Sequence, residues 1–256
     1  MTASLPLSGV VIAKNEAGRI GRCVASLACV CGEVLVLDSG SSDTTVAEAD
    51  GAGARVCHQD WLGFSAQKNA AIAAASQPWV LLLDADEWLG DGAADALRAL
   101  FANRTIERAD VWELERRTHF LGTALNHGGW GHEGVERLFR NDLRYLPSHV
   151  HEKLDLRGRK VAHLHARIEH DTARSLDDYR AKLAHYATLW ATQKHAEGHR
   201  TTLFSAPAHA AAYWLKNFIL RGGFLDGAMA RTYHFCHARY VYEKYRALQQ
   251  RHRNVA

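Results

Sequence analysis

Short apolar runs alternate with polar, helix-like segments along the first hundred residues. Four apolar runs have the length and composition of buried strands: residues 7–13, 33–37, 55–58 and 79–83. The segments that follow these runs have helical character: residues 16–28, 44–50, 63–75 and 92–101. Asn15 is expected to cap the first of these helices. Strands that alternate with helices predict a parallel sheet with helices on both faces.

The pattern changes after residue 101. Four further segments have the composition of strands: residues 110–117, 135–139, 143–156 and 160–168. From Ser175 onward apolar residues recur at helical spacing, and more helix is expected near residues 206–220 and from residue 228. We therefore expect an α/β domain over residues 1–172, followed by a C-terminal helical region over residues 173–256.

Carboxylates stand at the ends of two predicted strands. Asp38 ends one of them, and the pair Asp84 and Asp86 ends the other. Ligands of parallel α/β sheets bind beyond the carboxyl ends of the strands, so these acids should line one crevice. Two hard oxygen ligands there suit Mg²⁺ or Mn²⁺ and, through the metal, a diphosphate. The alternative is that these acids only face solvent at the ends of the strands and bind no metal. The dinucleotide motif GxGxxG does not follow the first strand, and no P-loop motif occurs, so both of those sites lose support.

Charge is divided unevenly along the chain. Residues 1–150 carry a net charge of −6 and residues 151–256 one of +9, so an acidic half that suits metal is joined to a basic half that suits anions. No apolar run is long enough for a transmembrane helix. Residues 1–9 have neither a basic start nor a long apolar stretch, so a secretory signal is not expected. The five cysteines form no CxxC pair, which favours reduced thiols and a cytoplasmic location.

Four motifs occur in order along the first hundred residues: residues 11–16, 36–45, 67–69 and 83–87. Together they resemble the nucleotide-sugar glycosyltransferases of family 2, which have the GT-A fold. The resemblance implies that Asp38 holds the nucleobase, with Lys68 near it, and that Asp84 reaches the ribose. It also implies that Asp86 ligates a divalent metal, Mg²⁺ or Mn²⁺, on the diphosphate.

An inverting transferase also needs a carboxylate that takes the proton from the acceptor hydroxyl. Glu152 stands where the family places this base, and Glu133 and Glu136 remain alternatives. His170 best matches the histidine with which the family completes the metal shell, and His165 is the next candidate.

Three segments of the C-terminal part extend the resemblance to most of the chain: residues 169–171, 175–189 and 216–227. They are similar to lipopolysaccharide core glucosyltransferases of the WaaE type. This resemblance implies transfer of a hexose, typically glucose from UDP-glucose, to an inner-core heptose. The alternatives are another family-2 transfer, to a polysaccharide or glycolipid, and a sugar-nucleotide or polyanion-binding protein without turnover. Retention of Asp84, Asp86 and a candidate base argues against the non-catalytic alternative.

The last 56 residues carry a net charge of +6 with aromatic residues among the cations. This composition predicts peripheral contact with the inner face of an anionic membrane, while the alternative is an aromatic core under a solvated basic surface. The candidate cations are Arg221, Arg231, Arg239, Lys244, Arg246, Arg251 and Arg253. Nucleic acid is not an expected partner, because no RNA or DNA motif accompanies the charge.

Overall fold

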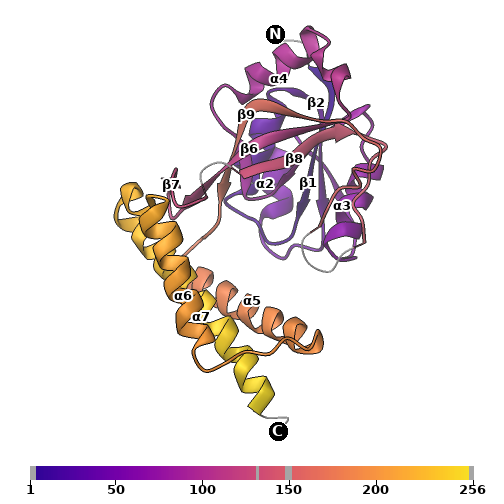
Figure 1. Ribbon diagram of the computed structural model, residues 1–256. Coiled ribbons are helices and arrows are strands. Elements are labelled where there is room, and N and C mark those ends of the chain that lie inside the picture. The colour runs from indigo at the N-terminus through magenta and orange to yellow at the C-terminus, as the bar shows by residue number, and fades with distance from the viewer. Residues whose placement is uncertain (1–3, 131–132, 148–151, 254–256) are drawn as a thin grey trace. The chain divides into compact units, whose positions relative to one another are not determined.

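A computed structural model describes residues 4–130, 133–147 and 152–253 (Figure 1). The described residues separate into two compact units. The first holds those of Met1–Arg116 and Gly134–His170, and the second those of Arg117–Glu133 and Asp171–Ala256. Residues 117–133 were expected in the first domain, but the described residues among them pack with the C-terminal helices.

Nine elements form the N-terminal part of the first unit: β1 (Leu5–Ala13), α1 (Ile20–Ala28), β2 (Cys31–Asp38), α2 (Thr45–Gly51), β3 (Arg55–His58), α3 (Phe64–Ala73), β4 (Trp79–Asp84), β5 (Glu87–Leu89) and α4 (Ala93–Ala102). A short 3-10 helix, η1 (Thr105–Arg108), follows them. Strands β1 to β4 pair in parallel in the order β3-β2-β1-β4. The predicted alternation of strands and helices is thus confirmed.

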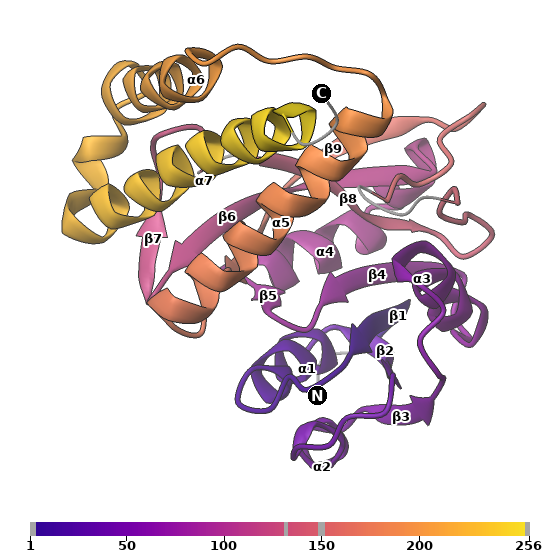
Figure 2. The same cartoon turned by 90° about the horizontal axis from the view of Figure 1, so that it is seen from below.

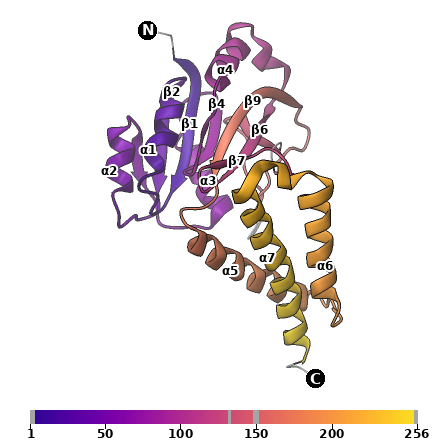
Figure 3. The same cartoon turned by 90° about the vertical axis from the view of Figure 1, so that its left-hand side faces the viewer.

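The sheet continues with strands from later in the chain: β8 (Glu133–Arg140), β6 (Val111–Phe120) and β9 (Val161–Asp171), with β5 at the far edge. Strand β8 is antiparallel to β4, and β5 is antiparallel to β9. The architecture is the mixed α/β class expected from the sequence, with helices at the C-terminal end. Figure 3 shows β1, β4, β6 and β9 in one sheet.

Alternate residues of the parallel strands enter two separate hydrophobic clusters. Val11 and Leu83 belong to a cluster that includes buried residues of α1 and α4. Val10 and Leu82 belong to a second cluster, which includes residues of α3. Successive side chains of a strand point to opposite faces, so both faces of the sheet are buried. This double burial explains why the strands appear in the sequence as continuous apolar runs.

Two sequence-based expectations about local structure are wrong. Asn15 does not cap a helix, because α1 begins only at Ile20; Asn15 has φ +55° and its Oδ1 accepts a hydrogen bond from Ser42 N at 2.8 Å. The described part of residues 143–156 contains no strand but a single bridge between Tyr145 and Leu154. The Asn69 side chain satisfies the backbone of Tyr145 in place of a neighbouring strand, at 2.8 and 2.9 Å.

The second unit is mainly helical. It contains β7 (Thr123–Leu125), α5 (Leu176–Ala196), α6 (Ser205–Tyr213), a π-helix η2 (Trp214–Leu220), a 3-10 helix η3 (Gly223–Asp226) and α7 (Gly227–Arg253). Ser175 caps α5, since its Oγ accepts a hydrogen bond from Asp178 N at 3.1 Å. Figure 2 shows α5, α6 and α7 within this unit. Among the described residues, no helix has both the length and the hydropathy to cross a bilayer.

Residues 117–130 join the second unit through an aromatic core. Phe120, from the end of β6, lies 5.0 Å from the ring of Tyr179 on α5 and 5.2 Å from Tyr233 on α7. Trp130 lies 5.5 Å from the ring of Tyr233. Aromatic pairs at such distances add favourable contacts to the burial of large apolar areas. The helices therefore form their core together with this segment.

Candidate active site

The carboxylates predicted to share a crevice end two strands on either side of β1. In the ladder, Ile12 is paired with Asp84 of β4, and Ala13 is paired with Asp38 of β2. The two acids therefore end adjacent parallel ladders at the same edge of the sheet. This is the edge at which open α/β sheets bind ligands.

Asp38 organises the turn that follows β2. Its side chain is buried, and Oδ2 accepts hydrogen bonds from Gly40 N and Ser41 N, both at 2.9 Å. Oδ1 accepts a further bond from the Ser41 hydroxyl. Gly40 has φ +81°, a conformation that favours glycine. The carboxylate thus fixes the loop after β2, beside the place where a donor nucleotide is expected.

Asp84 lies between two cations. Lys68 Nζ, on α3, is 3.3 Å from Asp84 Oδ1, and Arg137 Nη2, on β8, is 2.7 Å from Asp84 Oδ2. Burial alone raises the pKa of Asp84, but the charges of Arg137 and Lys68 outweigh it and hold that pKa well below its usual range. Asp84 is therefore a carboxylate anion at neutral pH, and 34% of its side chain stays accessible.

Two charged residues beneath Asp84 were missed in the sequence analysis. Glu87 is fully buried, its Oε1 is 2.6 Å from Arg137 Nη2, and its Oε2 accepts a hydrogen bond from Asp84 N at 3.1 Å. A buried charge of this kind is tolerated only when it is paired and hydrogen-bonded. The sequence contained one signal, because Arg137 is a charged residue within a predicted strand and directly precedes the apolar pair Leu138 and Phe139.

Glu152, the candidate base, lies beside the same lysine. Its Oε2 is 3.9 Å from Lys68 Nζ, so Lys68 faces both Asp84 and Glu152. The alternatives remain open. Burial raises the pKa of Tyr145, and Glu136 is close enough to add to that effect, while the Tyr145 ring lies 5.4 Å from Lys68 Nζ. Glu133, the other alternative, is exposed.

Asp86 and His170 meet across two antiparallel strands. His170 of β9 is paired with Glu87 of β5, and its Nε2 lies 3.6 Å from Asp86 Oδ2. Arg19 Nη1 lies 3.9 Å from the same oxygen. Burial raises the pKa of Asp86, but contact with His170 outweighs this and leaves the pKa lowered. His165, the other histidine considered, is exposed and lies against the ring of His163 at 5.0 Å.

These two side chains suit a divalent cation. A carboxylate oxygen and an imidazole nitrogen converge, and His170 Nδ1 is buried without a hydrogen-bond partner. Within the described residues, no group of three or more His, Cys, Asp or Glu could hold a metal ion. The described residues therefore offer Asp86 and His170 as ligands here, and a bound cation would need further oxygens, for example from a ligand or water, to complete its shell.

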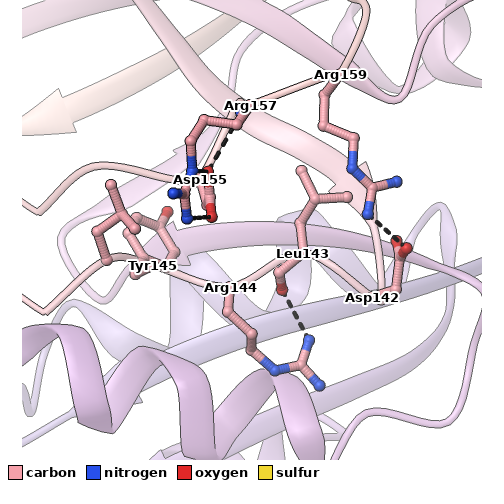
Figure 4. A pocket seen from close by; sticks show the side chains of 8 residues that line it. Asp142, Leu143, Arg144, Tyr145, Asp155, Arg157 and Arg159 are labelled. Carbon is pink, nitrogen blue, oxygen red and sulfur yellow. Dashed lines mark hydrogen bonds and ion pairs between the residues drawn. The ribbon is translucent and has the colours of Figure 1, made fainter.

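A separate hollow lies in the first unit (Figure 4). Three arginines line it, and each already has a partner. Arg157 is paired with Asp155 at 2.6 Å, Arg159 with Asp142 at 2.7 Å, and Arg144 donates to backbone carbonyls. Because these guanidinium groups are engaged with the protein itself, the carboxylate cluster is the better candidate for an active site.

The family model "Glycosyl transferase family 2" matches residues 8–140, more than half of the chain. The chain belongs to this family and is a glycosyltransferase, and the GT-A fold expected from its motifs is confirmed.

Known proteins extend the comparison. The chain is 29% identical, over 96% of its length and 95% of the other's, to the lipopolysaccharide core biosynthesis glycosyltransferase LpsC of Rhizobium meliloti (strain 1021). Two solved structures are more distant. S. aureus TarS 1-349 with UDP-GlcNAc is 15% identical, with 96% and 93% coverage and a TM-score of 0.49. Glucosyl-3-phosphoglycerate synthase from Mycobacterium tuberculosis, with Mn²⁺, UDP-glucose and phosphoglyceric acid, is 26% identical, with 43% coverage of each chain and a TM-score of 0.37.

Proposed function

We propose that this glycosyltransferase is an inverting, metal-dependent hexosyltransferase that moves glucose from UDP-glucose to a heptose of the lipopolysaccharide inner core. One observation carries the proposal: Lys68 lies 3.3 Å from Asp84 and 3.9 Å from Glu152. A donor-side acid and a candidate base thus border the same buried cation. The core-biosynthesis name of the Rhizobium relative, which aligns over nearly the whole chain, supports the acceptor class.

The donor is held at the carboxylate edge in this proposal. Asp38 and the loop it fixes border the nucleobase, and Asp84 accepts a hydrogen bond from a ribose hydroxyl. Lys68 adds a cation beside Asp84, and Arg137 keeps that acid ionised. Asp86 and His170 would hold Mg²⁺ or Mn²⁺ beside the diphosphate of the donor. When bound, the cation neutralises the charge that grows on the departing diphosphate.

Glu152 activates the acceptor. Its carboxylate takes the proton from a sugar hydroxyl while that oxygen attacks the anomeric carbon of the donor. The bond from the anomeric carbon to the phosphate oxygen breaks, and the nucleoside diphosphate leaves with the electron pair. Attack from the face opposite the leaving group inverts the anomeric configuration, so an α-linked donor gives a β-linked product. A lipid-linked acceptor implies that the enzyme works peripherally at the inner face of the cytoplasmic membrane.

A donor and acceptor panel tests the proposal. UDP-glucose, UDP-galactose, UDP-GlcNAc and GDP-mannose are each offered with Mn²⁺ to a delipidated inner-core oligosaccharide, to a polysaccharide and to a glycolipid, and the products are analysed by mass spectrometry and NMR. We expect one hexose on a heptose, with a β linkage, from UDP-glucose. Transfer only to a polysaccharide or glycolipid would favour a family-2 transferase that acts on that acceptor instead. Donor binding without transfer to any acceptor would favour a binding protein.

A further inference from the structure

Exposed apolar side chains gather where α6 is joined to α7. Six large apolar residues of residues 214–229 are exposed: Leu215, Ile219, Leu220, Phe224, Leu225 and Met229. Leu220 exposes 74% of its surface and Leu225 60%. Surfaces that meet only water seldom leave so much apolar area in one short segment. We call residues 214–229 the apolar turn, and Figure 2 shows its place between α6 and α7.

The apolar turn is held in shape by packing inside the second unit. Phe218 stacks on Trp214 with ring centroids 4.2 Å apart, and Phe224 lies 6.2 Å from Phe218. Phe218 also lies 5.7 Å from the buried ring of His234. That ring fits against Gly223 so closely that a Cβ there would lie 2.4 Å from His234 Nε2. The exposed side chains are therefore presented by an ordered turn.

The surface of the apolar turn is positively charged. Residues 198–242 contain five Lys or Arg and one acid, Asp226. Only 3% of the Asp226 side chain is exposed. Its oxygens accept hydrogen bonds from Asn126 N, His127 N and His127 Nδ1, at 2.8, 2.8 and 2.6 Å. The one negative charge is thus turned inward, while Lys216 and Arg221 are exposed on the turn.

Arg221 combines the two properties in one place. It follows Leu220 directly, its Nη1 donates to Asn217 Oδ1 at 3.2 Å, and its guanidinium lies against Gly129. Two of the cations nearer the C-terminus are engaged with neighbours instead. Arg239 is paired with Glu243 at 2.7 Å, and Lys244 lies 4.8 Å above the ring of Trp190. The exposed cations of the apolar turn are thus better placed for an external anion than these two.

We propose that the apolar turn inserts into the surface of an anionic bilayer. Leu220, Phe224 and Leu225 enter the boundary between headgroups and acyl chains, and Lys216 and Arg221 meet lipid phosphates. This inference rests on the proposed function for its biological reason, a lipid-linked acceptor. A second copy of the chain is a poorer partner, because two identical turns would bring like charges together.

Vesicle flotation with the full chain tests the proposal without donor or acceptor. We expect binding to vesicles of phosphatidylcholine with phosphatidylglycerol, and weak binding to phosphatidylcholine alone. The double variant Leu220→Ser/Leu225→Ser should bind anionic vesicles at least tenfold more weakly at both low and high salt. Arg221→Gln should lose mainly the salt-sensitive part of binding, because it removes a charge and keeps the apolar contacts. Arg221→Lys should restore much of it.

Matched variants outside the apolar turn serve as controls. Phe235→Ser removes an exposed aromatic from α7, and Arg239→Gln removes a cation paired with Glu243. Both should bind as the wild type does. Near-UV circular dichroism checks folding, and light scattering checks oligomeric state. The proposal would be overturned if the wild-type chain did not bind anionic vesicles, or if the variants of the apolar turn bound them as the wild type does. It would also be overturned if those variants changed only in oligomeric state and not in vesicle binding. Failure of glucose transfer would leave this result intact, so the two proposals fail separately.

Discussion

Lys68 Nζ lies 3.3 Å from Asp84 Oδ1, and only 6% of Lys68 is exposed. The lysine comes from α3 and the acid from the end of β4, so a helix and a strand of the sheet supply opposite charges to one point. Arg137 contacts the other oxygen of the same acid. Asp84 therefore keeps a cation if Lys68 is lost, whereas Glu152 loses the cation that lies 3.9 Å from it.

Lys68→Met tests this relationship. The variant should fold, because Asp84 stays paired with Arg137, with a loss of roughly 1–3 kcal/mol in unfolding free energy for a broken buried pair. UDP-glucose affinity should fall at least about tenfold, or ~1.4 kcal/mol, as measured by calorimetry with Mn²⁺. Lys153→Met is the control, because Lys153 is an exposed cation that directly follows Glu152 in the sequence. Equal donor affinity in the two variants would remove Lys68 from the donor site.

Sequence alone identified the acids at the strand ends. Asp38 and Asp84 follow apolar runs whose parallel pairing was predictable, and the pairing brings both to one edge. The contact between Asp86 and His170 could not be predicted from the sequence pattern alone. Eighty-four positions separate the two residues, and they converge because β5 and β9 pair with Glu87 opposite His170. A slip of one residue would turn His170 to the other face of the sheet, and no local pattern fixes such a register.

Buried charges and non-local packing were the main features that sequence reasoning missed. Glu87 was noted only as part of the motif at residues 83–87, and Arg137 only as part of a predicted strand. Either charge alone is costly to bury, and their pairing arises only when β5 and β8 come together. The place of residues 117–133 was missed for a similar reason. Trp130 packs on Tyr233, about a hundred residues away. The segment around Trp130 has no periodic pattern of apolar residues from which this contact could be predicted.

Asp86→Ala should separate metal binding from folding. The lost carboxylate is one of two side chains that suit a cation, so Mn²⁺ should no longer strengthen donor binding and transfer should stop. Calorimetry with and without Mn²⁺, and turnover with excess EDTA, measure the effect. Asp95→Ala, on α4, removes an exposed acid and should behave as the wild type does. Full turnover of wild type in EDTA, or of Asp86→Ala, would contradict a metal-dependent mechanism.

His170→Ala should weaken metal dependence less severely than Asp86→Ala does. It removes the imidazole and keeps Asp86, so the Mn²⁺ concentration for half-maximal activity should rise while saturating metal recovers part of the rate. His165→Ala is the matched control, because His165 lies on the same strand and is exposed. If His165→Ala raised the metal requirement and His170→Ala did not, the assignment of the metal-shell histidine would pass to His165.

Acid should weaken the second unit through His237. Burial, with a smaller effect from His234, lowers the pKa of His237 from its ordinary 6.5 to about 3. Below pH 6.5 the unfolded chain therefore binds a proton that the folded chain does not. Stability is lost as pH falls from 6.5 toward 3, by up to about 1.4 kcal/mol per pH unit. His237→Phe should reduce this slope in urea unfolding followed by tryptophan fluorescence, and His234, whose pKa burial also lowers, should account for part of the slope that remains.

Tyr179→Phe is the control for the cause of that slope. Tyr179 Oη and His237 Nε2 share a hydrogen bond of 2.6 Å, but burial is the main cause of the lowered pKa. The variant keeps the ring and the burial and loses the bond. It should therefore lower stability by about 1 kcal/mol at neutral pH and keep most of the acid dependence. Parallel pH profiles for wild type and His237→Phe would show that another group governs the acid lability.

Glu152→Gln should stop proton transfer while the donor still binds. The amide keeps the size of the side chain and cannot accept the acceptor's proton, so the transfer rate should fall by ~10²–10⁴. UDP-glucose affinity should change little, since Asp84 stays paired with Lys68 and Arg137. Single-turnover transfer measures the rate and calorimetry the affinity. Glu136→Gln and Glu133→Gln are matched controls, and both should retain activity. If either one is inactive while Glu152→Gln turns over normally, the base is that residue and Lys68 has no part in positioning it.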